Sequence, residues 1–403
     1  MKDNKIRTNK KSFRIGYRRE VIKLIMANGF LPMASLELWE RKKRNLLERI
    51  LVMEKEGIIE KKKTENGKII VIKNYNANKE EITNTMSQKL IDQYETTSIL
   101  QRKFAVGKSR GLTATRAMRT AETFVMMYNA DVRTYVDEKP DLEDGINIED
   151  ACYYTSIEIK HWEPIANYSK TSKQIKNART IGVLFAHGMT YSIYNVGSSM
   201  IEWYVSGEDK MRTHIEKLVR SKYNIDADII IHVDSAIFFT TKISNFIPVI
   251  TGEVARRRNG QERTTLMNLD YTYKNIYILP YDNQGKNMLR ILCCPEWQFI
   301  MKSLFFINGE KINTDDIEIA CDAYDEQSEQ FILLFCIPNI SKLRLFVKRA
   351  LIEKKKNRFR IICFKNQLPL ILPLVCYKDT TIAEVSTVDF ESFYQTWINN
   401  IYQ

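Results

Sequence analysis

The chain lacks the features of secreted and membrane-spanning proteins. Its seven cysteines lie singly or adjacent inside apolar runs, with no Cys-x-x-Cys spacing. This pattern indicates buried free thiols of a reducing compartment rather than a disulfide framework or a zinc site. No apolar h-region follows the charged N-terminus, and the longest apolar stretches, such as 368–375, are far shorter than a membrane span. We therefore expect a cytoplasmic protein with no membrane partner.

Histidine is scarce as well, and its placement disfavours two classes of DNA-processing enzyme. The four histidines are His161, His187, His214 and His232. Relaxases and initiators of the His-hydrophobic-His class need two histidines one residue apart to hold their metal, and these four are far apart. Tyrosine recombinases need a His-x-x-Arg motif, and none is present.

Positive charge is concentrated at one end of the chain. Residues 1–75 hold 13 lysines and 7 arginines against 9 acidic residues, a net charge of +11. The other 328 residues carry a net charge of +1. A positive electrostatic field confined to one end of the chain attracts a polyanion, and nucleic acid is the commonest soluble polyanion. The charge distribution therefore predicts a nucleic-acid partner for the N-terminal segment.

The N-terminal segment has the element order of a winged helix-turn-helix. An apolar stripe from residue 13 ends at Asn28-Gly29 and predicts a first helix. A short second helix over 33–40 and a third over 41–56 follow, and Gly57 ends the third. Two β-rich runs, 58–63 and 68–72, flank Asn66-Gly67, a strong hairpin signal. Three helices followed by a hairpin predict a winged helix-turn-helix domain over 1–80.

The third helix and the hairpin supply the candidate DNA contacts. A rotation of 100° per residue places Arg41, Asn45, Glu48 and Val52 opposite the apolar face. Arginine and asparagine can pair with base edges in a major groove, whereas lysines on the wing suit phosphates. The candidate DNA-binding residues are Arg41, Lys42, Lys43, Arg44, Asn45, Arg49, Lys61, Lys62, Lys63 and Lys68. The alternative is a winged helix that binds protein, with these charges as a solvated face.

The remainder of the chain predicts a helical connector and a mixed-sheet α/β domain. The connector, 81–150, carries helices over 86–104 and 112–128 and ends in an acidic loop, 137–150. The α/β domain, 151–403, alternates strands and helices. Its predicted strands are 180–186, 189–196, 228–233, 275–279, 288–293, 331–335 and 359–364, and its helices are 207–222, 296–305 and 340–353. The expected fold class is α+β.

A metal-dependent nuclease is the enzymatic alternative. Nucleases of the PD-(D/E)xK type hold Mg²⁺ between two carboxylates on adjacent strands, and a lysine orients water. Asp141, Glu158 and Lys160 match this pattern literally. Thr155-Ser156 before Glu158 also resembles a helix N-cap, which is a structural interpretation. Asp234, at the end of the predicted strand 228–233, is a second candidate. Outside this alternative we expect no metal ligands and no cofactor.

Six stretches of the chain resemble proteins of integrative and conjugative elements and plasmids of Gram-positive bacteria, related in layout to the replication-relaxation family. They are "NLLERILVMEKEGII", "SRGLTATRAMRTAETFVMM", "CYYTSIEIK", "RTIGVLFAHGMTYSIYNVG", "YKNIYILPYDNQGKNMLRIL" and "SKLRLFVKRALIEKKKNRFRIICFKNQ". The resemblance implies a mobile-element protein with an N-terminal winged helix that acts in replication or conjugative transfer initiation. It also implies a degenerate, restriction-endonuclease-like core, without supplying a catalytic residue.

The sequence thus predicts a double-stranded-DNA-binding protein whose α/β domain assembles with itself or with replication or transfer proteins. Two alternatives stay open. In the first, the α/β domain nicks or cleaves DNA with Mg²⁺. In the second, the protein is a winged-helix transcriptional regulator whose α/β domain senses a ligand or a partner.

Overall fold

The chain folds into two compact units in a computed structural model. The first comprises Met1–Asn129 with Tyr135–Lys139, and the second Ala130–Thr134 with Pro140–Gln403. The residues described are 16–39, 43–84, 86–96, 112–142, 150–161, 178–199, 203–226, 229, 232–251, 267, 269, 272–306, 320–353, 358–375 and 382–401. Within these ranges, no helix combines the length and the apolar composition that crossing a membrane requires.

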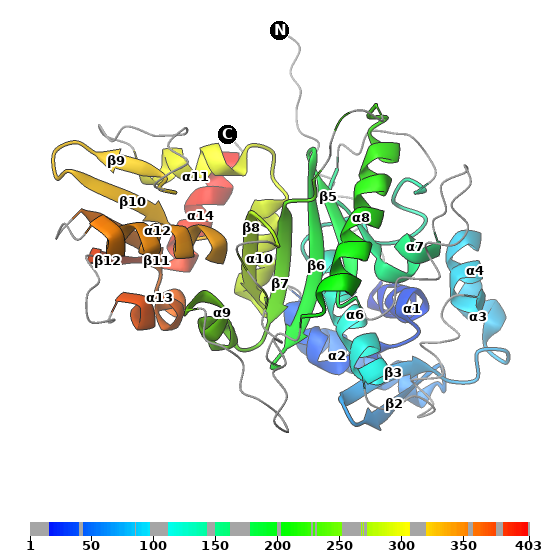
Figure 1. The fold of residues 1–403 in the computed structure, drawn as a ribbon. Coiled ribbons are helices and arrows are strands. Elements are labelled where there is room, and N and C mark those ends of the chain that lie inside the picture. The colour runs from blue at the N-terminus through cyan, green and yellow to red at the C-terminus, as the bar shows by residue number, and fades with distance from the viewer. Residues whose placement is uncertain are drawn as a thin grey trace, which may run out of the picture. The chain divides into compact units, whose positions relative to one another are not determined.

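The first unit combines helices with a small antiparallel sheet (Figure 1). Its elements are α1 (Tyr17–Asn28), β1 (Leu31–Pro32), the 3-10 helix η1 (Met33–Leu38), α2 (Lys43–Lys55), β2 (Ile59–Thr64), β3 (Gly67–Ile72), α3 (Lys79–Thr83), α4 (Gln88–Thr96) and α6 (Leu112–Asn129). The sheet order is β1-β3-β2, so β2 is an edge strand. Helix α6, predicted as part of a connector, belongs to this compact unit.

Turn residues fix the boundaries of these elements. Gly29 ends α1 in the left-handed conformation, at a φ of 76°, and Gly57 follows α2 at a φ of 75°. Gly67 takes a φ of 129° where the hairpin turns. The predicted second helix, 33–40, is instead a 3-10 helix, Met33–Leu38, that ends before the extended Trp39. A short strand, β1, precedes it and was not predicted.

A buried carboxylate joins three elements of the first unit. Glu20 on α1 is 7% exposed, and its Oε1 accepts hydrogen bonds from Trp39 Nε1 and Tyr128 OH, both at 2.9 Å. The apolar core beside it includes alternate residues of β3, Ile69 and Val71, which pack against α6. Burying an acid is costly unless it is hydrogen-bonded, and these two donors satisfy it.

The second unit is built around a five-stranded mixed sheet. Its strands, in the spatial order β4-β5-β6-β7-β8, are β4 (Cys152–Thr155), β5 (Gly182–Ala186), β6 (Met189–Gly197), β7 (Ser235–Thr240) and β8 (Asn275–Pro280). The first three form an antiparallel meander, whereas β7 runs parallel to both β6 and β8. Helix α7 (Ser156–His161) follows β4, and α8 (Val205–Lys222) connects β6 to β7 and packs on one face of the sheet (Figure 1).

A second, four-stranded sheet completes this unit. Its order is β12-β11-β10-β9, with strands β9 (Ala323–Asp325), β10 (Gln330–Leu334), β11 (Phe359–Phe364) and β12 (Ile382–Val388). The associated helices are α9 (Ile247–Thr251), α11 (Trp297–Phe305), α12 (Ile340–Glu353), α13 (Leu368–Val375) and α14 (Phe390–Ile401), with 3-10 helices η3 (Ile243–Phe246) and η4 (Lys365–Gln367). Strands β10 and β11 are parallel and flank α12, so the predicted strand 331–335, helix 340–353 and strand 359–364 form a βαβ unit.

One apolar core spans both sheets of the second unit. It contains Phe238 of β7 and Ile278 of β8 together with Leu333 of β10 and Ile361 of β11. Helix α12 contributes Phe346 to the same cluster. The predicted mixed-sheet domain is therefore present, but it holds two sheets instead of one.

The segment predicted as strand 288–293 is a helix. α10 (Asn283–Leu292) begins at Asp282, whose side chain accepts a hydrogen bond from Gly285 N at 2.9 Å. Residues Asp282–Gly285, which lie between the predicted strands 275–279 and 288–293, thus form the N-cap and the first helical turn. An ideal Cβ on Gly285 would lie 1.7 Å from the Pro280 carbonyl oxygen, so only glycine permits this close approach of helix and strand.

Strand β7 was also missed. The predicted strand 228–233 lies partly outside the described residues, and His232 and Val233 are irregular. The strand itself begins two residues later, at Ser235. The chain therefore enters the sheet at Ser235, after the end of the predicted strand 228–233.

We expect Gly285→Ala to lower the free energy of unfolding by about 2 kcal/mol or more, because the new methyl group forces α10 away from Pro280. Urea denaturation of the full chain measures the change. Asn287→Ala, on the same helix, removes only a side-chain hydrogen bond from Arg290 Nη1 at 3.3 Å and serves as the control, with an expected cost of about 1 kcal/mol or less. Equal stability of the two variants would contradict the close approach.

Candidate functional site

Helix α2 packs its apolar face inward and presents a polar outer face. The buried residues are Leu46, Ile50 and Met53, and the exposed ones include Asn45, Glu48, Arg49 and Val52. This orientation is the one that the helical period predicts. Leu51 is 49% exposed, because it lies about 100° round the helix from Ile50.

The basic residues at the start of α2 are described only in part. Arg41 and Lys42 lie outside the described residues, and Lys43 begins the helix with a side chain that is not described. Arg44 Nε lies 2.9 Å from Glu48 Oε1 in an exposed i,i+4 ion pair. Arg49 is exposed and has no acidic partner within 4 Å in the described part of the chain.

Two of the four candidate lysines of the hairpin are paired within the unit. Lys61 Nζ lies 2.6 Å from Glu54 Oε2, and Lys62 Nζ lies 2.8 Å from Glu60 Oε1. Partly exposed ion pairs of this kind are weak and screened by salt, so a phosphate can compete for the lysines.

The other two lysines of the hairpin face each other. Lys63 on β2 and Lys68 on β3 are direct cross-strand neighbours, and both are exposed. Among the described residues, neither has a carboxylate within 4 Å. Like charges directly opposite each other destabilise an antiparallel pair. An anion bound between them would relieve that repulsion.

Glu158, a candidate nuclease carboxylate, instead caps a helix. Its Oε2 accepts hydrogen bonds from Thr155 N at 2.8 Å and from Thr155 Oγ1 at 2.9 Å. Glu158 N donates in return to Thr155 Oγ1 at 3.3 Å. This reciprocal pair is a capping box at the start of α7. The N-cap interpretation of Thr155-Ser156 therefore describes the local structure.

The other nuclease candidates are not on adjacent strands. Asp141 lies in an irregular segment, where its backbone oxygen accepts a hydrogen bond from Lys222 Nζ. Lys160 is on α7, and its side chain is not described. The five strands β4 to β8 contain no Asp or Glu. The sheet thus lacks the paired strand carboxylates that the PD-(D/E)xK pattern requires.

Asp234 precedes a strand instead of ending one. It lies immediately before β7, and its Oδ2 is 2.7 Å from Lys274 Nζ. In the described part of the chain, no three His, Cys, Asp or Glu side chains gather as metal ligands would.

A buried polar cluster on α8 was not found from the sequence. Glu208 is 3% exposed, and its Oε2 accepts hydrogen bonds from Thr180 Oγ1 at 2.8 Å and Tyr194 OH at 3.0 Å. The hydroxyls of Tyr194 and Tyr273 lie 2.8 Å apart. Burial raises the pKa of Tyr273 to about 12, so its hydroxyl stays protonated and can donate a hydrogen bond to the hydroxyl of Tyr194. Residues so distant in sequence give no local signal of this cluster.

Burial also perturbs the acid at the centre of this cluster. Desolvation raises the pKa of Glu208 above its ordinary value of 4.5, against the opposing effect of its hydrogen bonds from Arg179, Thr180 and Tyr194. Perturbed acids occur both in functional sites and in structural networks. Its hydrogen bonds join α8 to the segment before β5 and to β6, which is a structural role.

Comparison of the chain with protein-family models, with curated proteins and with solved structures finds no match.

Because folding favours protonated Glu208, its contribution to stability should fall as pH rises from about 4.5 through the raised pKa. We expect Glu208→Gln, which cannot ionise, to gain stability relative to the natural chain over that range. Urea denaturation at several pH values measures the difference. Ser206→Ala, on the exposed side of the same helix, should follow the natural chain at every pH. A constant difference between Glu208→Gln and the natural chain would contradict the raised pKa.

Proposed function

We propose that this chain is a double-stranded-DNA-binding protein whose first unit is a winged helix-turn-helix. In this proposal the outer face of α2 enters the major groove, and the hairpin β2–β3 lies along the phosphate backbone. The single observation that carries the proposal is the pair Lys63 and Lys68, two exposed like charges held opposite each other without a neighbouring carboxylate in the described residues. A phosphate would stabilise this arrangement, which costs free energy in the unbound protein.

The element order of the first unit supports the winged-helix interpretation. A helix, a short strand, a helical turn and a second full helix precede the hairpin, and β1 pairs with β3 to extend the small sheet. The helix before the hairpin, α2, keeps Asn45 and Arg49 exposed. These side-chain types suit adenine and guanine edges, respectively. The concentration of positive charge in residues 1–75 supports DNA as the partner.

The α/β unit is proposed to assemble and not to cut. Its antiparallel meander β4–β6, followed by α8 and the parallel strand β7, agrees with a restriction-endonuclease-like core. The absence of acids from strands β4 to β8 fits a degenerate form of that core. The sequence resemblance to replication-relaxation proteins supports a role in replication or transfer initiation of a mobile element, with the protein's own copies or replication and transfer proteins as further partners.

Lys63→Ala should flatten the dependence of DNA affinity on salt by about one unit of log–log slope, because one phosphate contact is lost. Fluorescence anisotropy of a labelled duplex, titrated at several KCl concentrations, measures the slope. The substitution removes a like-charge repulsion, so it should not unfold the hairpin. Lys79→Ala removes the same charge from α3, where Lys79 pairs with Glu95, and is the matched control. Equal loss of slope in both variants would refute the wing contact.

Arg49→Ala and Asn45→Ala should each relax base preference at one position of the bound site, by about 1–3 kcal/mol. Selection from a random duplex pool, followed by competition with single-base variants, measures the preference. Lys55→Ala, at the exposed end of the same helix, should leave the preferred sequence unchanged. Unaltered selectivity in both test variants would show that α2 does not read bases.

A further inference from the structure

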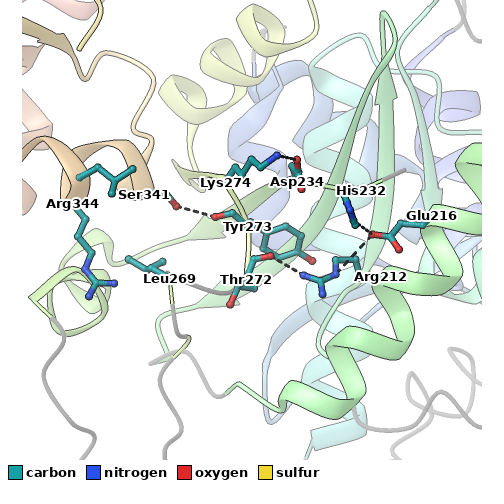
Figure 2. A pocket seen from close by; sticks show the side chains of 11 residues that line it. Arg212, Glu216, His232, Asp234, Leu269, Thr272, Tyr273, Lys274, Ser341 and Arg344 are labelled. Atoms are coloured by element: carbon teal, nitrogen blue, oxygen red, sulfur yellow. Dashed lines mark hydrogen bonds and ion pairs between the residues drawn. The ribbon is translucent and has the colours of Figure 1, made fainter. Parts of the chain in front are cut away.

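The second unit contains a charged pocket that the proposed DNA contacts do not use. Its volume is about 400 Å³, within the range of small-molecule sites. The lining residues come from α8, from the segments that precede β7 and β8, and from the first turns of α12 (Figure 2). They are Arg212, Glu216, His232, Asp234, Leu269, Thr272, Tyr273, Lys274, Ser341, Arg344 and Leu345.

One guanidinium of this pocket is held in a fixed position. Arg212 Nη1 donates to the Thr272 carbonyl at 2.8 Å, and its Nη2 lies 3.3 Å from Asp209 Oδ1. Glu216 Oε1 lies 4.0 Å from Arg212 Nε and accepts a hydrogen bond from Val233 N at 3.2 Å. Because the guanidinium has five N–H donors, these contacts fix its orientation and leave donors for a ligand.

The cations stand at separate places around the pocket. Figure 2 shows Arg344 of α12 on one side, Arg212 on the other, and Thr272 and Tyr273 between them. Lys274 lies at the rim, 77% exposed, with its ammonium 2.7 Å from Asp234. The apolar floor is well buried, since Leu269 is 6% and Tyr273 5% exposed. A single small anion would therefore not meet Arg344 and Arg212 at once.

The acids of the pocket restrict what it can accept. Glu216 and Asp234 would repel a continuous polyanion such as duplex DNA, and the volume is too small for one. A small ligand can instead place its anionic groups at the cations and its hydroxyl or N–H donors near the carboxylates. Guanidinium forks favour phosphate, with which they form paired hydrogen bonds.

We propose that this pocket binds a small molecule with two separated phosphate groups, of the size and chemistry of a dinucleotide. One phosphate would contact Arg344, and the other would contact Arg212 and Lys274. The sugar or base would lie over Leu269 and Tyr273. This site is independent of the hairpin and of α2, so it goes beyond the proposed recognition of duplex DNA.

Isothermal titration of the full chain with a 5′-phosphorylated thymidine dinucleotide tests the site. Arg344→Ala and Lys274→Ala should each weaken binding about tenfold, as expected for the loss of a charge-assisted hydrogen bond. Lys348→Ala removes the same charge from an exposed position on α12 outside the pocket and should bind as the natural chain does. The dinucleotide without its 5′ phosphate should bind about tenfold more weakly, and inorganic phosphate more weakly still.

Three results would overturn the proposal: no binding of the dinucleotide, equal binding with and without the 5′ phosphate, or equal losses in Arg344→Ala and Lys348→Ala. Lys274 is largely exposed, so its variant reports on the site even if Arg344→Ala folds poorly. Lys63→Ala should bind the dinucleotide normally. Loss of duplex binding is therefore tested by Lys63→Ala, and loss of dinucleotide binding in the pocket is tested separately by Arg344→Ala and Lys274→Ala.

Discussion

Burial of both faces of the five-stranded sheet determines where this protein can place its charges. Consecutive residues of β5 and β7 are all buried, so side chains on both faces of the sheet are removed from water. An unpaired charge cannot be accommodated there without a large cost, and these strands carry none. The polar chemistry of the unit therefore gathers at strand ends and on helices. Two features follow from this constraint. One is Glu208 on α8, which accepts hydrogen bonds from the hydroxyls of Thr180 and Tyr194. The other is the pocket lined by the segments that precede β7 and β8.

The first unit, by contrast, carries charges on a strand at an edge of its small sheet. Strand β2 lies at that edge and carries three successive lysines, two of which are paired with nearby acids. The same backbone that buries Ile69 and Val71 against α6 thereby holds cations at the surface. A neighbouring carboxylate, not position on the strand, separates the two kinds of lysine here. Lys61 is paired with Glu54, whereas Lys63, on the same strand, has no carboxylate within 4 Å among the described residues.

The sequence predicted elements best where local pattern and tertiary structure agree. The boundaries of α12 and β11 match the predicted 340–353 and 359–364, because a helical stripe and a β-branched run are bounded by clear breaks. α10 was mistaken for a strand, since Asp282–Gly285 resembles a turn until the contact of Gly285 with Pro280 is known. The exposed face of α2 followed from periodicity alone. The pocket did not, because Arg212, Lys274 and Arg344 lie more than a hundred residues apart from first to last and meet only through the crossover connections of the sheets.

Helix α12 has a consequence for how the second unit behaves as a whole. Its apolar side chains pack in the cluster that contains residues of β7 and β8 as well as of β10 and β11. Ile278 N also donates to the Pro338 carbonyl just before the helix, at 2.9 Å. Neither sheet can lose α12 without exposing part of its own interior. The two sheets therefore share part of their core, and a cut between them would expose the apolar residues that β7, β8, β10, β11 and α12 bury together.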